Sequence, residues 1–394
     1  MVNSLMNYSF TKSIYFLLAI IIKKIARINP EIMVFTSKPD YSDNARALSE
    51  YILRTTKKYK IYWRVNDAKR ERKLHPDINV RFISDNGLKR FSNLFIYLRA
   101  SYMFSTHSLS FYKGMKRDGQ HLINLWHGCS YKDRVNKSLS GKDYFFEKHL
   151  VAGPLFVKTK SYYFRCPDES YILAKGYPRY DWLLHKDERA TIYYKKLKEE
   201  CSHLIIWMPT FRNDKDGVYK DMAQFTQFPL VGCMSDWQRI DEIFRENNVK
   251  LIIKLHVKQA EYDVDWTRFS NITKISNEDI EKAGTNLYSF LACTDALISD
   301  YSSVAVDYMI VDKPIAFALD DYEQYKDARG FVVANPLDFM PGHHLYSIDD
   351  LRTFVKDVSS KQDPYCESRA RLFDTLVYRS DSYCKEIAES LGIK

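Results

Sequence analysis

The stretch that decides the fold covers residues 296–319 and reads ALISDYSSVAVDYMIVDKPIAFAL. It begins with an apolar run, Ala296–Ser299, which is typical of a buried strand. Serine is a preferred helix N-cap, so the pair Ser302–Ser303 predicts a helix that begins there and continues to about Val311. Asp-Lys-Pro then ends the helix, and the following IAFAL predicts the next buried strand. The stretch is therefore a predicted β–α–β unit, from which parallel α/β sheets are built.

The turn between this strand and this helix has the groups that bind anions. Backbone N–H groups and the positive end of the helix dipole lie there, beside the hydroxyls of Ser302 and Ser303. Asp307 follows Ser303 by four residues, so it is predicted one turn further along the same helix face. This arrangement suits a phosphate at the helix start and a hydroxyl-rich group next to it. A simpler interpretation stays open here, in which the serines only cap the helix and Asp307 is a solvated surface residue.

Length and composition limit the class of protein. A chain of 394 residues predicts two domains, and its 45% hydrophobic and 28% charged residues are normal for a globular protein. The formal net charge of +9 favours anionic partners such as phosphorylated substrates, acidic lipid surfaces or nucleic acid. The seven cysteines include no C-x-x-C pair, which argues against a disulfide framework or a zinc site and favours a reducing, cytosolic setting. No metal-ligand spacing is present, so we expect no cofactor.

The most hydrophobic run is IYFLLAIII at residues 14–22, with Lys23, Lys24 and Arg27 directly after it. Nine apolar residues are too few to cross a bilayer, which needs about 20, and no small-residue cleavage site follows as in a signal peptide. We therefore expect residues 1–28 to form a helix that lies on an anionic membrane surface, with its basic residues near acidic head groups. A helix that packs against the core is the alternative.

Strands alternate with helical stretches along the rest of the chain, which predicts parallel α/β sheets. The polar, helical stretch Trp182–Ser202 predicts a domain boundary, with a first domain at residues 29–185 and a second at 200–345. Residues 346–394 are predicted to be helices that pack back across both domains. The predicted strands are 32–36, 61–65, 79–83, 102–105, 122–126, 149–152 and 170–174 in the first domain, and 204–208, 251–255, 296–299 and 315–319 in the second.

Polar side chains follow several of these predicted strands. Ligands of parallel sheets bind at the carboxyl ends of the strands, so two sheets that face each other across a cleft would bring these residues together. Arginine holds phosphate with two bonds, and histidine accepts a proton near neutral pH. The set suits phosphoryl transfer from a phosphoanhydride without a metal. Its members are His127 with Gly128, Arg179, Pro209 with Thr210 and Arg212, Lys254 with His256, and the serine pair; strand alternation places Lys254 and His256 on one face.

The order of these motifs resembles the CDP-glycerol glycerophosphotransferase family of teichoic acid synthesis. The resemblance covers about residues 33–342, and the length is similar to that of short, primase-type members. It implies a GT-B fold, in which two Rossmann-like domains face each other across a cleft; the membrane helix expected at residues 1–28 would precede them. The segments that carry it are INLWHG (123–128), GYPR (176–179), PTFR (209–212), KLH (254–256), ISDYSSVAVDY (298–308), KPIAF (313–317) and DYEQYKDARGF (321–331).

The resemblance implies transfer of glycerol phosphate from CDP-glycerol to a hydroxyl of a lipid-linked acceptor, with release of CMP. The implied acceptor is a glycerol phosphate, poly(glycerol phosphate) or disaccharide on an undecaprenyl lipid, for teichoic acid or a similar capsule. A peripheral protein on the cytoplasmic face of the cell membrane is implied. Whether the chain forms a homo-oligomer stays open. Nucleic acid is not an expected partner, because the basic clusters of the chain contain no recognised nucleic-acid motif.

The resemblance also implies roles for single residues. His127 would be the general base on the acceptor hydroxyl, and His256 would stabilise or protonate the pyrophosphate as CMP leaves. The implied substrate-binding residues are Arg179, Ser302 and Ser303 on the phosphates, Thr210 by the cytidine, Asp307 on a donor hydroxyl, and further Gly128, Pro209, Arg212 and Lys254.

Two departures from the family pattern leave the polyol open. The family usually has Arg-x-His-Pro where this chain has KLHV at residues 254–257, and lysine lacks the two-pronged grip of arginine. The loop after Gly128 reads CSYKDR, where the family typically has Thr or Ile with Pro and Lys. Ribitol or another CDP-alditol is therefore an alternative to glycerol. A GT-B nucleotide-sugar glycosyltransferase and a non-catalytic membrane- or nucleic-acid-binding protein are the further alternatives.

Overall fold

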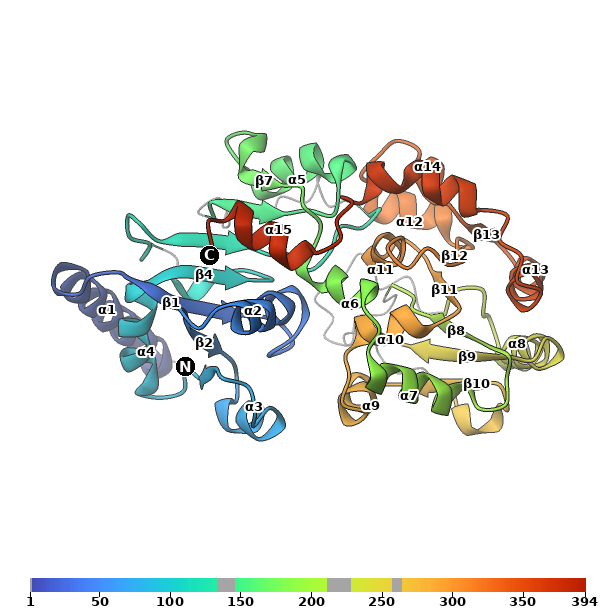
Figure 1. Cartoon of the computed structure of the whole chain (residues 1–394), viewed down its shortest axis with the longest axis horizontal. Helices are drawn as coiled ribbons and strands as arrows, with labels where there is room; N and C mark the ends of the chain where they lie inside the picture. The colour runs from blue at the N-terminus through green and yellow to red at the C-terminus, as the bar shows by residue number, and fades with distance from the viewer. Residues whose placement is uncertain (1, 113, 133–145, 211–227, 257–263) are drawn as a thin grey trace.

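The computed structural model describes residues 2–112, 114–132, 146–210, 228–256 and 264–394, with side chains from Ser13 onward. Two parallel sheets lie side by side, the first on the left of Figure 1 and the second on the right. The seven-stranded sheet has the order β3-β2-β1-β4-β5-β6-β7, and the six-stranded sheet has the order β10-β9-β8-β11-β12-β13. The predicted α/β class with two Rossmann-like sheets is confirmed.

The first sheet is built from short strands with helices between them. The sequence of helix α2 explains how such a helix packs on the sheet. Ala45, Leu48 and Ile52 recur at helical spacing and are buried against the sheet, while Arg46 and Glu50 form an ion pair on the other side of the helix. The strands are β1 (Asn29–Thr36), β2 (Lys60–Arg64), β3 (Arg81–Ile83), β4 (Ala100–Ser105), β5 (His121–Asn124), β6 (Lys148–Leu150) and β7 (Ile172–Leu173). The helices are α2 (Asp43–Thr55), α3 (Ala68–Leu74), α4 (Lys89–Arg99) and α5 (Val157–Phe164).

The second sheet is buried on both faces. Strands β8 and β9 read HLIIW and VKLIIK, near-continuous apolar runs of the kind that central parallel strands need. Its strands are β8 (His203–Trp207), β9 (Val249–Lys254), β10 (Ile272–Ile275), β11 (Ala296–Ser299), β12 (Ile315–Ala318) and β13 (His343–Leu345). Its helices are α8 (Met234–Glu246), α9 (Asn277–Lys282), α10 (Leu287–Cys293), α11 (Ser303–Tyr308) and α12 (Tyr322–Arg329).

The predicted β–α–β unit is present as β11, α11 and β12, with Ser302 at the N-cap. The helix is shorter than predicted, because it ends at Tyr308 rather than near Val311. After Tyr308 the chain continues in tight turns, in which Ile310 N–H donates to Asp307 C=O and Val311 N–H donates to Tyr308 C=O. These bonds span three residues instead of four, so the helix ends while the chain still curls toward β12.

Two strands were not predicted. Strands β10 and β13 lie at opposite edges of the second sheet, and they have four and three residues. Such short edge strands are too brief to show an alternating pattern. Other predicted strands were too long at one end: β5 stops at Asn124 and β9 stops at Lys254, so the polar residues after them lie in turns.

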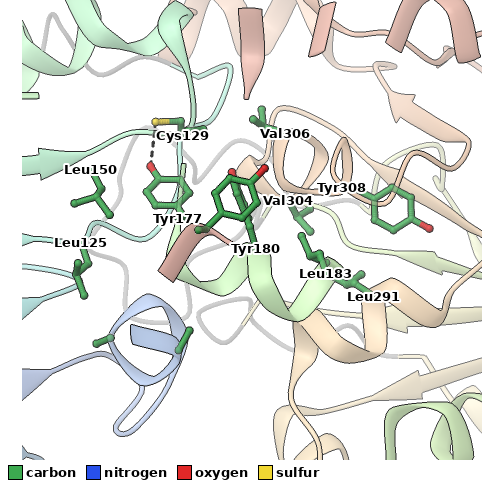
Figure 2. Close-up of a cluster of buried hydrophobic side chains, with 14 of the residues drawn as sticks. Leu125, Cys129, Leu150, Tyr177, Tyr180, Leu183, Leu291, Val304, Val306 and Tyr308 are labelled. Atoms are coloured by element: carbon green, nitrogen blue, oxygen red, sulfur yellow. Dashed lines mark hydrogen bonds between the residues drawn. The ribbon is translucent and has the colours of Figure 1, made fainter. Parts of the chain in front are cut away.

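A shared core joins the two sheets. Helices α6 (Asp181–Leu184) and α7 (Glu188–Lys198) connect them, and both pack against α10. Figure 2 shows side chains from both halves in one buried cluster, in which Leu183 of α6 lies beside Leu291 of α10. The cores of the two sheets are therefore continuous.

The C-terminal helices contact both halves of the molecule. Helix α13 (Ile348–Ser359) buries Phe354 in the core of the second sheet, α14 (Cys366–Leu376) follows, and α15 (Tyr383–Ser390) packs against α2. The carboxylate of Asp181 accepts hydrogen bonds from the N–H groups of Tyr383 and Cys384, at 2.6 and 3.1 Å. The chain thus returns to the first sheet after completing the second (Figure 1).

The N-terminal helix α1 (Val2–Ile25) has one packed face and one exposed apolar face. Ala19 is buried against the core that includes Leu94 and Leu98 of α4, which agrees with the core-packing alternative. Apolar side chains also remain exposed on this helix, namely Leu17, Ile20, Ile21 and Ile25. Across the residues that the structure describes, we find no helix with the length and apolar character needed to cross a bilayer.

Candidate active site

His127 lies in a turn that the surrounding structure holds in an unusual shape. Trp126 has φ of +52° and Gly128 has φ of +131°, so the backbone reverses sharply just after β5. The side chain of Asn124 accepts a hydrogen bond from Trp126 N–H at 2.9 Å, and Asn44 of α2 donates to the Trp126 carbonyl at 2.9 Å. These two amides fix the turn, and the His127 side chain is exposed at the carboxyl end of the sheet.

The hydrogen bond of His127 assigns its tautomer. Its Nδ1 lies 3.1 Å from the carbonyl oxygen of Thr106. A carbonyl only accepts, so Nδ1 carries the proton in the neutral ring and Nε2 keeps a lone pair. The ring has exposed surface, but the dense surrounding protein lowers the pKa of His127 well below 6.5, helped by His107, Lys160 and Arg179. A neutral imidazole with a lone pair on Nε2 is the form that a general base needs near pH 7.

Arg179 links the two halves of the protein through two buried ion pairs. It lies on η4 (Pro178–Tyr180), and its Nη1 donates to Asp43 while its Nη2 donates to Asp307, both at 2.6 Å. Burial acts to lower the pKa of Arg179, but the two carboxylates outweigh it and hold that pKa well above its usual value. The Nε–H of Arg179 is buried and has no hydrogen-bond partner among the described residues.

Asp307 is not a solvated surface residue, so that alternative is wrong. Its carboxylate is fully buried and accepts hydrogen bonds from Arg179, from the Tyr180 hydroxyl at 2.7 Å and from the Tyr288 hydroxyl at 3.3 Å. Burial raises the pKa of Asp307, and its bonds to Arg179 and Tyr180 oppose that rise. In this structure the protein supplies the partners of Asp307, so the role on a donor hydroxyl stays a prediction.

Gly128, Ser303 and Arg179 meet at one point. A Cβ added to Gly128 would lie 2.5 Å from Ser303 Oγ and 3.0 Å from Arg179 Nη2. No real Cβ fits that space, so only glycine allows the loop after His127 to approach α11 this closely. The Ser302 side chain makes no capping hydrogen bond, although Ser302 is the N-cap residue. Ser302 therefore occupies the predicted cap position without a side-chain cap, and its role on a phosphate stays a prediction.

Thr210 is held by a carboxylate that the sequence analysis did not select. Its N–H and its hydroxyl both donate to Asp300, at 2.8 and 2.6 Å, and both residues are buried. Asp300 follows β11 as Thr210 follows β8, and these strands are neighbours in the sheet. Pro209 precedes Thr210 at the same edge, and Arg212 lies outside the described residues.

Lys254 and His256 differ in their surroundings. Strand β9 ends at Lys254, so the alternation that placed the two residues on one face does not reach His256. Lys254 is buried, its Nζ donates to the Leu255 carbonyl at 3.2 Å, and desolvation lowers its pKa to about 8. His256 is exposed beyond the strand end. The pair therefore provides a buried cation and an accessible imidazole rather than two groups on one face.

The predicted residues fall into two groups. His127, Gly128, Arg179, Ser303 and Asp307 form one connected cluster between the sheets. Of the others, Pro209 and Thr210 follow β8, Lys254 and His256 lie at the end of β9, and Ser302 follows β11. Strands β9, β8 and β11 are consecutive in the second sheet. No cluster of three or more side chains suited to holding a metal ion occurs in the described part of the chain.

Several site residues were missed because only packing reveals them. Asp43 and Tyr288 reach Arg179 and Asp307 from distant parts of the chain, and no sequence pattern marks them. His107 stacks on His127 and was not selected either. The one usable signal was position, since Asp43 begins the first helix after β1 and His107 follows the end of β4.

Buried cations, two imidazoles and several hydroxyls thus lie at the ends of two parallel sheets, and these are the kinds of group that phosphoryl transfer requires. The chain matches the family described as CDP-Glycerol:Poly(glycerophosphate) glycerophosphotransferase over residues 18–386, and it belongs to this family. The predicted family is therefore confirmed.

The names of the relatives in this family refer to different polyols. The chain is 24% identical over 383 residues to the teichoic acid poly(glycerol phosphate) polymerase of Staphylococcus epidermidis, which covers 88% of this chain and 48% of that protein. It is 24% identical over 293 residues to the teichoic acid ribitol-phosphate primase of Bacillus spizizenii, covering 69% of each. The chain thus spans about half the length of the polymerase and 69% of the length of the primase.

Solved structures show the same fold. The wall teichoic acid polymerase TagF aligns with a TM-score of 0.72 at 18% identity, covering 100% of this chain and 97% of that chain. A UDP-GlcNAc 2-epimerase from Methanocaldococcus jannaschii aligns with a TM-score of 0.52 at 10% identity, covering 92% of this chain and 99% of that chain. At these identities the likeness concerns the fold alone.

Proposed function

We propose that the chain transfers glycerol phosphate from CDP-glycerol to a hydroxyl of a lipid-linked acceptor and releases CMP. The observation that carries this proposal is the His127 cluster. Thr106 holds the Nδ1 proton of His127, which leaves Nε2 to accept one, and Gly128 brings Ser303 and Arg179 beside it. Membership of the family supplies the class of donor.

The proposed reaction is a displacement at the phosphorus that carries glycerol. The acceptor oxygen forms a new O–P bond, the phosphoanhydride bond to CMP breaks, and the hydroxyl proton passes to Nε2 of His127. CMP leaves with the bridging oxygen and its electron pair, and His256 donates a proton to it or stabilises its charge. Both histidines return to their starting state by exchanging protons with water.

Arg179 can bind phosphate without leaving its carboxylates. A guanidinium has five N–H donors, and Asp43 and Asp307 each take one of them. The remaining donors, which include the buried Nε–H without a partner among the described residues, are proposed to bind phosphate oxygens. Its carboxylate partners fix the orientation of the guanidinium, and an oriented charge stabilises a transition state better than a mobile one.

The second sheet is proposed to hold the donor. Lys254 is protonated at pH 7 and buried, so it attracts a phosphate more strongly than a solvated lysine does. Thr210, fixed by Asp300, lies at the same sheet edge and is proposed to contact the cytidine together with Pro209. Ser302 and Ser303 are proposed to bind the phosphates.

The test is nucleotide release by the purified chain. CDP-glycerol and CDP-ribitol are compared side by side, each with a short lipid-linked acceptor and without it. Acceptor-dependent CMP release from CDP-glycerol supports the proposal, and release from CDP-ribitol alone changes the polyol but keeps the reaction. Consumption of a UDP-sugar with no CMP from either donor would overturn the function.

We also propose that α1 attaches the protein to an anionic membrane as a peripheral protein. Its exposed apolar side chains Leu17, Ile20, Ile21 and Ile25 lie on the same helix as Lys23 and Lys24. The double variant Ile20→Glu/Ile21→Glu changes exposed residues only, so it should fold normally and lose co-sedimentation with phosphatidylglycerol vesicles. Undiminished co-sedimentation would contradict this attachment.

A further inference from the structure

A second imidazole lies against His127. His107 follows β4 after Thr106, and its ring stacks on the His127 ring with 4.5 Å between centroids and 12° between planes. His127 also contacts Trp126, whose ring centroid is 4.0 Å away with 39° between planes. The His127 ring thus packs against two aromatic rings, which restricts rotation about its side-chain bonds.

Thr106 anchors both imidazoles. Its carbonyl oxygen accepts from Nδ1 of His127 at 3.1 Å, and its hydroxyl lies 2.9 Å from Nδ1 of His107. Because these contacts come from one residue, a movement of either ring disturbs the anchor of the other. The two rings and Thr106 therefore form one unit at the carboxyl ends of β4 and β5.

We propose that His107 is a positioning residue for His127, whose stacked ring fixes the orientation of the base and whose nearby imidazole makes His127 harder to protonate. The inference rests on the proposed function, in which His127 removes the proton of the acceptor hydroxyl.

The charges around His127 support the second half of this proposal. Two stacked imidazoles at this distance take up a second proton only at lower pH, because like charges repel. Desolvation and His107 are the leading causes that lower the pKa of His127, followed by nearby cations, while the hydrogen bond to Thr106 raises it. The titratable and charged groups that face this imidazole are His107 after β4, Lys160 of α5 and Arg179 of η4, with Asp43 and Asp307 both bound to Arg179.

Two variants separate orientation from charge. His107→Phe keeps an aromatic ring on His127 and removes the titratable group, whereas His107→Ala removes both. The matched control is His121→Phe, because His121 begins β5, the strand that precedes His127, and also stacks on a ring, that of Tyr102, at 4.8 Å. If the alanine variant fails to fold, the phenylalanine variant and its control still decide the question.

The first readout is the pKa of His127 in the ligand-free protein, measured by deuterium exchange at the imidazole C2 followed by mass spectrometry. We expect His107→Phe to raise this pKa by about one unit, as the loss of a like charge at contact distance does in a partly solvated site. His121→Phe should leave it unchanged. An unchanged His127 pKa in His107→Phe would overturn the inference.

The second readout is the pH profile of kcat/KM for CDP-glycerol. In His107→Phe the acid limb should move to higher pH by about one unit, while kcat at pH 8.5 falls less than in His107→Ala because a ring still packs on His127. In His107→Ala kcat should fall by about tenfold at every pH with KM little changed, because the base is no longer oriented. A merely structural residue would lower activity without moving the acid limb.

The two readouts fail independently. A shifted His127 pKa with no CMP release from any donor would remove the proposed function and keep the relation between the two histidines. Normal CMP release with an unmoved acid limb in His107→Phe would keep the function and overturn the role of His107.

Discussion

The substitution Asp307→Asn tests what Asp307 does. In the structure Asp307 joins α11 to Arg179, and both side chains of this ion pair are only 1% exposed. Asparagine keeps the size of the side chain and an acceptor for Tyr180, but it removes the charge that faces the guanidinium. Arg179 would then have a single carboxylate, that of Asp43, in a buried site.

The expected loss of stability follows from this geometry. Removing one partner of a buried ion pair costs about 3 to 5 kcal/mol, and the remaining bond to Asp43 places the expected loss at about 3 kcal/mol. For a chain of 394 residues that unfolds as one unit, this corresponds to a decrease in Tm of about 4 °C. The matched control is Asp349→Asn, since the Asp349–Arg239 ion pair is largely exposed and should contribute about 0 to 1 kcal/mol.

The assay is thermal unfolding of the ligand-free protein, followed by CDP-glycerol kinetics. If Asp307 holds Arg179, the Tm falls without ligand and kcat/KM falls with it. If Asp307 instead serves mainly to bind a hydroxyl of the donor, the ligand-free Tm stays unchanged and only KM rises. An Asp307→Asn protein with the same Tm as Asp349→Asn would refute the structural reasoning.

Three further predictions concern the same site. His127→Ala and His256→Ala should each lower kcat by about 10²-fold or more while calorimetry still detects CDP-glycerol binding, and unchanged turnover would exclude acid–base catalysis by that residue. Gly128→Ala should lower kcat by at least about tenfold, because its Cβ would displace Ser303. Gly87→Ala controls for backbone strain, since Gly87 has φ of +58° and open space around it. Equal effects of the two substitutions on kcat would show that the close approach of Gly128 to Ser303 is unimportant. Burial lowers the pKa of Lys254 to about 8, so the free energy of unfolding should rise as the pH increases from about 8 to 10, because the unfolded lysine keeps its proton to higher pH. The affinity for the donor should fall over the same pH range. Measurements of unfolding and binding against pH should show neither change in Lys254→Met.

Local sequence patterns predicted most of the elements that position the site. Strand β11 was predicted at Ala296–Ser299 and is found there, because an apolar run followed by a serine N-cap marks both its end and the next helix. The edge strands β10 and β13 were missed, since three or four residues show no periodicity. The exposed apolar face of α1 was visible as an apolar run, but the face that packs on α4 was not distinguishable in it.

Residue chemistry at strand ends likewise predicted His127, Arg179 and the serine pair as members of one site. It did not predict their partners. Arg179 bonds to Asp43 at a separation of 136 residues and to Asp307 at 128, and the preference of arginine for carboxylates does not say which of many carboxylates will be near.

The sequence by itself determined the α/β architecture, the family and the residue types of the site, because strand and helix patterns depend on neighbours along the chain. Only the tertiary structure decided the states of these residues. It buried Asp307 and paired it with Arg179, it assigned the proton of His127 to Nδ1 through Thr106, and it placed His107 on the ring of His127. Charge state and tautomer depend on burial and on the nearest donors, and these are set by how distant segments meet.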